Sequence, residues 1–265
     1  MLPRLKWPQR LTPRGKTHNR RKAAVPEGQR IYAIGDIHGR ADLLAQLHRQ
    51  IGEDAATAPL GTKKTIVYLG DYVDRGLDSK GVIDHFLTTP MEDFESIHLK
   101  GNHEDILLGF LEDISIGPGW FDIGGDATVL SYGVRIPAGL SSAQRFEHVW
   151  KEFRTRVPPD HLSFLSSLRL MHQSGDYVFV HAGIKPGVPL EKQKSNDLMW
   201  IRGEFLDSRQ DHGKVIVHGH RPTKQPDIQN HRIGIDTGAF ASNVLTCIVL
   251  EGETQRFLST AVRQA

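Results

Sequence analysis

The chain has 265 residues and a formal charge of +2, and hydrophobic residues make up 38% of it, enough for a substantial core. No apolar stretch approaches the roughly 18 residues of a membrane-spanning helix, and the single cysteine, Cys247, excludes a disulfide within the chain. Cys247 lies in the apolar run NVLTCIVL, where we expect it to be buried. These features suit a reducing compartment, and we expect a cytoplasmic protein.

The first 29 residues are basic, in contrast to the rest of the chain. Residues 1–29 carry eight Lys or Arg and one acid, Glu27, for a charge of +7, whereas the remaining residues carry −5. Four prolines oppose a continuous helix, so the composition predicts a flexible arm. Three interpretations stay open: an arm without a specific role, a contact with an acidic partner, membrane surface or nucleic acid, and a transit peptide.

From residue 30 onward, predicted strands alternate with predicted helices. Short apolar runs predict strands at Ile31–Ile34, TIVYL, FESIHL, YVFV, KVIVH, RIGID, NVLTCIVL and TQRFL. Apolar residues at helical spacing predict helices in ADLLAQLHRQI, in DILLGFL, and in SKGVIDHFL with Ser79 as N-cap. The last two strands are expected to form a hairpin around Glu251–Gly252. This alternation predicts an α/β domain over residues 30–265, in which ligands gather beyond the carboxyl ends of the strands.

Residues 112–170 interrupt the alternation. Ser141 and Gln144 have the spacing of a capping box at the start of a helix in SSAQRFEHVWKEF. Pro158–Pro159 ends that helix, and DHLSFLSSL predicts another helix with Asp160 as its cap. We interpret the segment as a helical insertion, which either supports the packing or forms a lid that shapes the substrate site.

Polar residues typical of metal sites follow five of the predicted strands. They are Asp36 and His38 in GDIHG; Asp71, Asp74 and Arg75 in GDYVDRG; Asn102, His103 and Glu104 in GNHE; His181 in HAG; and His218 and His220 in HGH. Taken singly, a Gly-Asp after a strand is often a turn, and a lone histidine is more often structural than a ligand. Together, these residues supply the oxygen and imidazole ligands that suit Mn, Fe or Zn.

The motifs GDIHG, GDYVDRG, GNHE, HAG and the Gly-His at 219–220 resemble, in this order, those of the phosphoprotein phosphatase family. That family is part of the calcineurin-like metallophosphoesterase superfamily. The segments IGGDATVLSYG, MWIRGEF and IDTGAF are similar to its bacterial branch, which includes the bacteriophage lambda phosphatase. The resemblance covers residues 30–240. It implies a four-layer α-β-β-α sandwich of two mixed β-sheets.

The resemblance also implies two divalent metal ions. It places one ion on Asp36, His38 and Asp71, and the other on Asp71, Asn102, His181 and His220. Asp71 would bridge the ions, a position that suits a carboxylate because a neutral ligand cannot neutralise two adjacent dications. We expect Mn²⁺, with Fe or Zn as alternatives, since these ligands accept several divalent ions. Such a pair would generate a hydroxide that attacks phosphorus directly, without a covalent phosphoenzyme.

An acid and two arginines complete the site that the resemblance implies. His103 would protonate the departing alkoxide, and Asp74 would orient and charge its imidazole. Arg75 would bind the phosphate in a bidentate manner together with Asn102, and Arg202 in WIRGEF matches a second phosphate-binding arginine.

Other residues near the motifs are expected to have structural roles. His218 is expected in the core or beside a ligand, Asp236 in a turn or orienting a ligand histidine, and Glu104 at a helix N-terminus. Two residues depart from the family pattern: Ala182 replaces a glycine, and Arg221 replaces a threonine. These departures leave the metal residues intact but put the substrate in question.

The leading hypothesis is a metal-dependent protein phosphatase acting on phosphoserine and phosphothreonine, and on phosphotyrosine as a further candidate, in a protein or peptide. The alternative is a symmetrical diadenosine tetraphosphate hydrolase or another nucleotide phosphoesterase. Such relatives typically lack the aspartate that matches Asp74 and carry GNHD instead of GNHE, and both features favour the phosphatase. Two further hypotheses are a phosphate-binding scaffold without turnover, which the complete ligand set disfavours, and a nucleic-acid-binding protein that uses the basic arm.

Overall fold

Two mixed five-stranded sheets form the centre of the structure, a computed structural model that describes residues 22–135 and 137–261. The first sheet has the order β10-β9-β1-β2-β3. Its strands β1 (Gln29–Ile34), β2 (Lys63–Tyr68) and β3 (Phe94–His98) are parallel. The strands β9 (Thr246–Glu251) and β10 (Thr254–Ser259) form the predicted antiparallel hairpin.

The second sheet has the order β4-β5-β6-β8-β7. Its strands β5 (Tyr177–Val180), β6 (Val215–His218) and β8 (Arg232–Gly234) are parallel. The antiparallel strands β4 (Met171–Ser174) and β7 (Asp227–Ile228) flank them. These two short flanking strands were not among the predicted elements.

The sheets pack face to face through apolar side chains on the inner face of each sheet. The side chains between them in the sequence point to the outer face and are apolar as well. Ile31 and Ala33 of β1 belong to a buried cluster between the sheets that also contains Phe179 of β5. Their neighbours Tyr32 and Ile34 point to the opposite face and pack in a cluster with the helices. Because both faces of β1 are buried, its sequence is a continuous apolar run rather than an alternating one.

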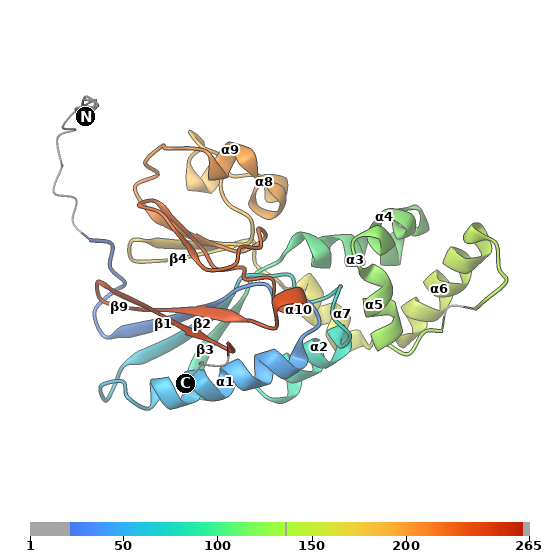
Figure 1. Ribbon diagram of the computed structural model, residues 1–265, viewed down its shortest axis with the longest axis horizontal. Helices are drawn as coiled ribbons and strands as arrows, with labels where there is room; N and C mark the ends of the chain where they lie inside the picture. The colour runs from blue at the N-terminus through green and yellow to red at the C-terminus, as the bar shows by residue number, and fades with distance from the viewer. Residues whose placement is uncertain (1–21, 136, 262–265) are drawn as a thin grey trace, which may run out of the picture.

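Helices cover both outer faces of this pair of sheets. In Figure 1, α1 (Ala41–Ala55) and α2 (Ser79–Thr88) lie below the first sheet, and α8 (Ser195–Trp200) and α9 (Gly203–Leu206) lie above the second. The four layers confirm the predicted α-β-β-α sandwich. Cys247 is fully buried in the cluster of the first sheet, as predicted.

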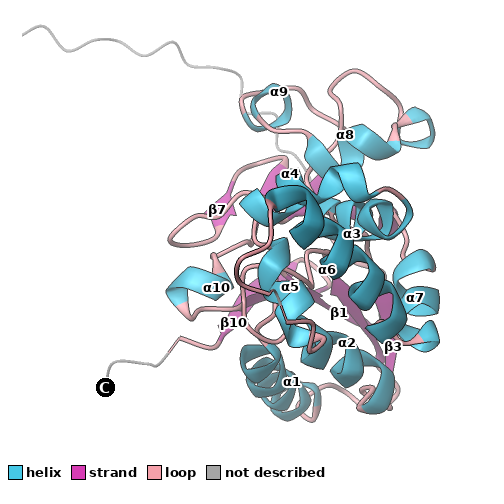
Figure 2. Cartoon of the chain, turned by 90° about the vertical axis from the view of Figure 1, so that its right-hand side faces the viewer, coloured by secondary structure: helices cyan, strands magenta, loops and turns pink. Residues whose placement is uncertain are grey.

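A run of helices between β3 and β4 stands at one end of the sandwich and faces the viewer in Figure 2. It consists of α3 (Asn102–Glu112), a 3-10 turn (Ile114–Ile116), α4 (Gly117–Asp122), α5 (Gly125–Ser131), α6 (Ser142–Arg156) and α7 (Pro159–Ser166). The predicted capping box of α6 is confirmed, because Ser141 accepts the N–H of Gln144 and the Gln144 side chain accepts the N–H of Ser141. That this segment is an insertion with boundaries at 112 and 170 stays a prediction.

Two predicted helix caps are wrong. The helix α2 begins at Ser79 itself, and its N-cap is Asp78, whose carboxylate accepts the N–H of Gly81. The helix α7 begins at Pro159, so Asp160 lies inside its first turn. A proline suits the first helical position because its missing N–H would have no partner there.

The basic arm predicted over residues 1–29 falls mostly outside the described residues, which begin at 22. Of its last residues, Val25 is buried in the cluster between the sheets, so this end of the arm packs on the domain. Within the described part of the chain, no helix combines the length and apolarity needed to cross a bilayer.

Candidate active site

The loops that carry the predicted site residues leave the carboxyl ends of parallel strands in both sheets. Several of these residues have a left-handed backbone with positive φ: His38, Asp71, Asp74, Arg75 and His220. Residues other than glycine seldom adopt this conformation, and such strain concentrates at functional sites. The strained backbone at these loops is therefore a sign that they are shaped to place side chains.

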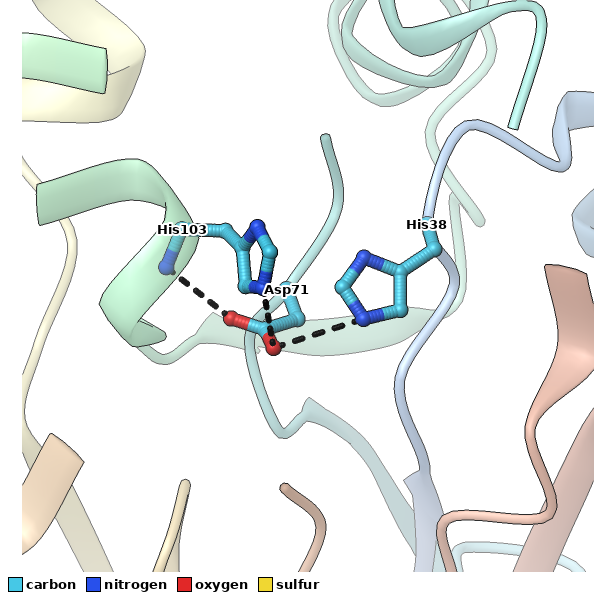
Figure 3. A group of neighbouring side chains, drawn as sticks. All are labelled: His38, Asp71 and His103. Carbon is cyan, nitrogen blue, oxygen red and sulfur yellow. Dashed lines mark hydrogen bonds and ion pairs between the residues drawn. The ribbon is translucent and has the colours of Figure 1, made fainter. Parts of the chain in front are cut away.

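Asp71, which follows β2, lies at the centre of the site (Figure 3). Its Oδ2 is 3.5 Å from Nε2 of His38 and 3.8 Å from Nε2 of His103, and its Oδ1 is 3.4 Å from Nε2 of His181. Two groups of candidate ligands share it, namely His38–Asp71–His103 and Asp71–His181–His220. In each group the ligand atoms all lie within 4.8 Å of one another.

The hydrogen bonds of two histidines leave lone pairs directed into the site. Nδ1 of His38 donates to the carbonyl of Val73 at 2.8 Å, and Nδ1 of His181 donates to the carbonyl of Leu69 at 2.9 Å. Because a carbonyl oxygen only accepts, Nδ1 of each ring carries a proton, and burial lowers the pKa of both rings, so in the neutral rings Nε2 carries none. Nε2 of His181 lies 3.0 Å from Oδ1 of Asn102, which is also an acceptor. Such converging acceptors are stabilised by a cation.

Burial controls the protonation of these groups. It lowers the pKa of His38 to about 3 and that of His220 to about 3, so both rings are neutral, which is the form that binds metals. Burial would raise the pKa of Asp71, but His181 and His103 outweigh it and lower that pKa below its usual value. Neutral imidazoles around an ionised carboxylate fit Mn, Fe or Zn, so this donor set suits the metal ions that the sequence predicts.

Asp36, a predicted ligand, lies outside both groups. Its carboxylate accepts the N–H of His220 at 2.9 and 3.2 Å and lies beside the carboxyl group of Asp236. Burial, and then the charges of Asp236 and Asp71, raise the pKa of Asp36 well above its usual value. Two adjacent buried carboxyl groups need a shared proton or a nearby cation. Ligation by Asp36 therefore stays a prediction.

His103 and Asp74 form the predicted pair. Nδ1 of His103 donates to Oδ2 of Asp74 at 2.6 Å. The Asp74 carboxylate also accepts from Nε1 of Trp120 at 2.8 Å and from Oγ1 of Thr128 at 2.6 Å. Burial lowers the pKa of His103, but Asp71 and Asp74 outweigh it and raise that pKa above its usual value. The imidazole is thus able to keep a proton near neutral pH.

Trp120 of α4 and Thr128 of α5 are site residues that the motifs did not identify. Both are fully buried, and both come from the predicted helical insertion. Two glycines allow this approach: a Cβ at Gly124 would lie 2.8 Å from the backbone nitrogen of Arg75, and one at Gly125 would lie 2.4 Å from the ring of Trp120. The family-like segment IGGDATVLSYG was the signal available for Thr128. This run of helices therefore builds the site in addition to packing beside it.

The guanidinium group of Arg75 faces both histidines of the first group. Its Nη1 donates to Nε2 of His38 at 2.9 Å, and its Nη2 lies 3.2 Å from Nε2 of His103. The backbone N–H of Arg75 donates to the carbonyl of Gly124 at 3.0 Å, which fixes the loop against α5. The structure thus places a half-buried positive charge beside the candidate metal ligands, where a phosphate group would need it.

Arg202, the second predicted arginine, is exposed and contacts a predicted ligand. Its Nε donates to Nε2 of His220 at 3.2 Å. A neutral His220 then carries its proton on Nδ1, which lies 3.2 Å from Nε2 of His181. His220 could bind a metal through Nδ1 only after this contact with Arg202 is given up. Arg221, which follows His220 in the sequence, has an exposed side chain.

Glu104 has a larger role than that of a helix N-terminal acid. Its carboxylate accepts the N–H groups of Asp71 at 2.9 Å, Tyr72 at 2.7 Å and Gly101 at 2.9 Å. Burial, and then the charge of Asp71, raises the pKa of Glu104 to about 7. Glu104 therefore accepts the N–H of Gly101, the N-cap of α3, and also fixes the loop that presents Asp71.

His218 and Ala182 lie in the core beside the site. Nδ1 of His218 donates to the carbonyl of Gly219 at 3.0 Å, and burial lowers the pKa of His218 to about 4. Ala182 packs in the apolar cluster between the second sheet and α8 and α9. Neither side chain belongs to the two groups of candidate ligands.

The geometry can be compared with known proteins. Residues 29–243 match the profile of the calcineurin-like phosphoesterases. The chain belongs to this family. Two relatives are named bis(5'-nucleosyl)-tetraphosphatase PrpE, asymmetrical. The one from Oceanobacillus iheyensis is 25% identical over 253 residues, covering 89% of this chain and 93% of the relative. The one from Bacillus velezensis is 30% identical over 231 residues, covering 80% and 86%.

Solved structures share the fold across different activities. A putative diadenosine tetraphosphatase matches with a TM-score of 0.59 and 20% identity, over 90% of this chain and 98% of the other. A cold-active protein tyrosine phosphatase matches with a TM-score of 0.56 and 17% identity, over 89% and 81%. At such low identity these matches support the fold alone.

These comparisons confirm the superfamily and a phosphoesterase hydrolase. They give no support to the narrower resemblance to the lambda phosphatase branch, and they do not support the leading hypothesis of a protein phosphatase. The names of the relatives fit the alternative of a nucleotide phosphoesterase better.

Proposed function

We propose that the protein is a metal-dependent nucleotide phosphoesterase that cleaves bis(5'-nucleosyl) tetraphosphates into unequal products. The observation that carries this substrate class is the shared name of two relatives, each matched over at least 80% of this chain. Unequal cleavage of a chain of four phosphates gives a nucleoside monophosphate and a nucleoside triphosphate. The proposal adopts the alternative from the sequence and replaces its symmetrical cleavage by an asymmetrical one.

The two groups around Asp71 are the proposed metal site. His38 and Asp36 would complete the ligands of one ion; His181, His220 and Asn102 would complete those of the other. Divalent ions, when bound, neutralise phosphate charge and make a water molecule acidic enough to serve as the nucleophile. Mn²⁺ is the proposed metal, and the donor set also suits Fe and Zn.

Two residues of the chain, Arg75 and His103, would act on the substrate itself, and Asp74 would position His103. Arg75 would orient a phosphate group through its guanidinium, which already points into the site. Because Asp74 holds Nδ1 of His103, the protonated ring presents its second N–H, at Nε2, to the site. His103 would therefore donate a proton to the leaving oxygen, and Asp74 would position it.

A second candidate is the protein phosphatase of the leading sequence hypothesis. The buried His103–Asp74 pair favours it, because a serine or threonine alkoxide is a poor leaving group that requires a proton. A nucleoside triphosphate is a better leaving group and depends less on such an acid.

A direct comparison of substrates tests the proposal. The Mn²⁺-loaded protein would be assayed with diadenosine tetraphosphate, a phosphoserine peptide and a phosphotyrosine peptide, with products separated by anion-exchange chromatography. We expect the highest kcat/KM for the dinucleotide, with AMP and ATP in equal amounts. The Asp71→Asn variant, purified in parallel, controls for contaminating phosphatases.

Faster turnover of a phosphopeptide would overturn the proposal in favour of the second candidate. Two molecules of ADP as the main product would retain the substrate class but refute the asymmetrical cleavage.

A further inference from the structure

An exposed aromatic ring lies beside Arg75, the residue proposed to orient a phosphate group, and has no role in the function proposed above. Phe240 lies in α10 (Ala239–Ser242) and keeps 37% of its surface exposed, which is unusual for a phenylalanine. Its ring centre is 5.0 Å from the guanidinium carbon of Arg75 and 5.6 Å from the ring centre of His38. A solvent-exposed aromatic ring in contact with a site for charged groups is a candidate surface on which a flat ligand could stack.

The ring has a fixed position relative to the site. Arg40, which follows β1, donates from Nη1 to the carbonyl of Ala239 at 3.0 Å. Oγ of Ser242 donates to the carbonyl of Thr237 at 2.8 Å, and this closes the turn on its other side. The exposed ring is therefore part of a pre-formed surface, which lowers the entropic cost of binding a ligand there.

Support for Arg75 alone does not account for the ring. The guanidinium group of Arg75 already bonds to His38 and lies beside His103, and its backbone bonds to Gly124. The ring also makes a cation–π contact with this guanidinium, which an aliphatic side chain could not make, and yet 37% of the Phe240 surface stays exposed. An aromatic ring that stays exposed gains little for folding, but it gains a stacking partner when a flat ligand binds.

We propose that Phe240 stacks on the base of the nucleoside whose own phosphate is held by Arg75, and that this contact determines which phosphoanhydride bond is cleaved. The inference rests on the proposed function and deepens it. Because the ring contacts Arg75, only a ribose can lie between the base stacked on Phe240 and the phosphate held by Arg75. The reacting phosphate is then the α-phosphate, the one attached to that ribose.

Cleavage at this position accounts for unequal products. The oxygen of water bonds to the α-phosphorus, and the bond from that phosphorus to the bridging oxygen breaks. The bridging oxygen leaves with the other three phosphates, which stay on the second nucleoside, and the proton of water passes to solvent. The products are a nucleoside monophosphate and a nucleoside triphosphate.

The test compares a substrate that has bases with one that has none. For wild type, Phe240→Ala, Phe240→Leu and Phe240→Trp, kcat/KM would be measured with diadenosine tetraphosphate and with inorganic tripolyphosphate. We expect the ratio of the two constants to fall about 5- to 150-fold in Phe240→Ala and Phe240→Leu, the range for loss of one stacked base, and to be restored in Phe240→Trp. The share of ADP among the products should rise in the first two variants.

Leu60→Ala is the matched control, because Leu60 is another exposed large apolar residue and lies in the loop after α1. The kcat/KM ratio and the product pattern of Leu60→Ala should equal those of the wild type.

Equal losses on both substrates in Phe240→Ala would overturn the inference, because they would mean that the ring acts only through Arg75. If the wild type does not cleave the dinucleotide, the proposed function fails together with this inference; if it does and the ratio is unchanged, only this inference fails.

Discussion

The two halves of the site are built differently, although they share Asp71. In the half formed by the first sheet, His103 and Asp74 are fixed by buried donors from α4 and α5. In the half formed by the second sheet, His220 contacts the exposed Arg202 through the nitrogen opposite the one that faces His181. The His103–Asp74 pair is thus organised before any ligand binds, whereas the two candidate metal histidines that face an arginine, His38 beside Arg75 and His220 beside Arg202, must change a hydrogen bond when a metal arrives.

This difference indicates that the His103–Asp74 pair serves proton transfer, whereas the histidines that face an arginine serve metal binding. Proton transfer depends on distances of tenths of an ångström, so a buried and fully bonded pair suits it. A metal ligand only needs a lone pair at the correct place, and a surface arginine is able to move away from it. Changes at His103 and Asp74 should therefore affect the chemical step, and changes at His220 should affect metal loading.

Replacement of the shared residue should break both halves. In Asp71→Asn, the lost carboxylate removes the charge that faces both groups of histidines, and we expect kcat/KM to fall by about 1000-fold or more, as the loss of several kcal/mol of charge stabilisation implies. Elemental analysis after Mn²⁺ loading should show less than one metal ion per chain. Asp93→Asn serves as the control, because its side chain is 85% exposed. Full metal content in Asp71→Asn would refute the central place of this carboxylate.

Replacement of the proton donor should affect only the first half. In His103→Asn, we expect about a 100- to 10,000-fold loss of kcat on an alkyl phosphate, the range for removal of a general acid, with metal content retained. The loss on p-nitrophenyl phosphate should be smaller, because its leaving group needs no proton. Equal losses on the two substrates would contradict the role of His103 as the acid.

The sequence predicted the site more completely than its surroundings, for a physical reason. The residues Asp71, His103, His181 and His220 each follow a short apolar run, and parallel strands bring their carboxyl ends together. Local motifs therefore sufficed to predict which side chains meet. The same reasoning predicted the capping box at Ser141, which is a contact between neighbours in sequence.

What the sequence did not predict depends on contacts between distant segments or on substrate chemistry. Trp120 and Thr128 reach Asp74 from 46 and 54 residues away; Thr128 lies in the family-like segment IGGDATVLSYG, but its contact with Asp74 cannot be read from neighbouring residues. Phe240 ended a family-like segment, but its place beside Arg75 follows only from the packing of α10. The preference for a protein substrate went further than the motifs allowed, because the same metal residues serve different phosphoesters.

The support from α4 can be tested by removing one hydrogen bond. Trp120→Phe keeps a buried ring but deletes the N–H that Asp74 accepts, so we expect about a 10-fold loss of kcat, at the low end for an outer-shell contact. Trp150→Phe is a matched control in α6, where the indole donates to the carbonyl of Phe110 instead. A comparable loss of kcat in both variants would mean that the helices support the fold in general and not Asp74.

The smallest expected effect distinguishes the halves by the sign of their pH dependence in the metal-free protein. The folded pKa of His103 is raised above 6.5, so its stabilising contribution is present in full below pH 6.5 and is lost as the pH rises through the folded pKa. The folded pKa of His220 is lowered to about 3, so between pH 3 and 6.5 the unfolded chain binds the extra proton, and His220 destabilises the fold as the pH falls.

Urea unfolding of wild type, His103→Gln and His220→Gln between pH 5.5 and 9 measures both contributions. Relative to wild type, His103→Gln should be most destabilised at the acidic end, and His220→Gln should improve there. Parallel curves for the two variants would show that burial, rather than the neighbouring carboxylates, governs both histidines, and the contrast between the halves would then rest on hydrogen bonding alone.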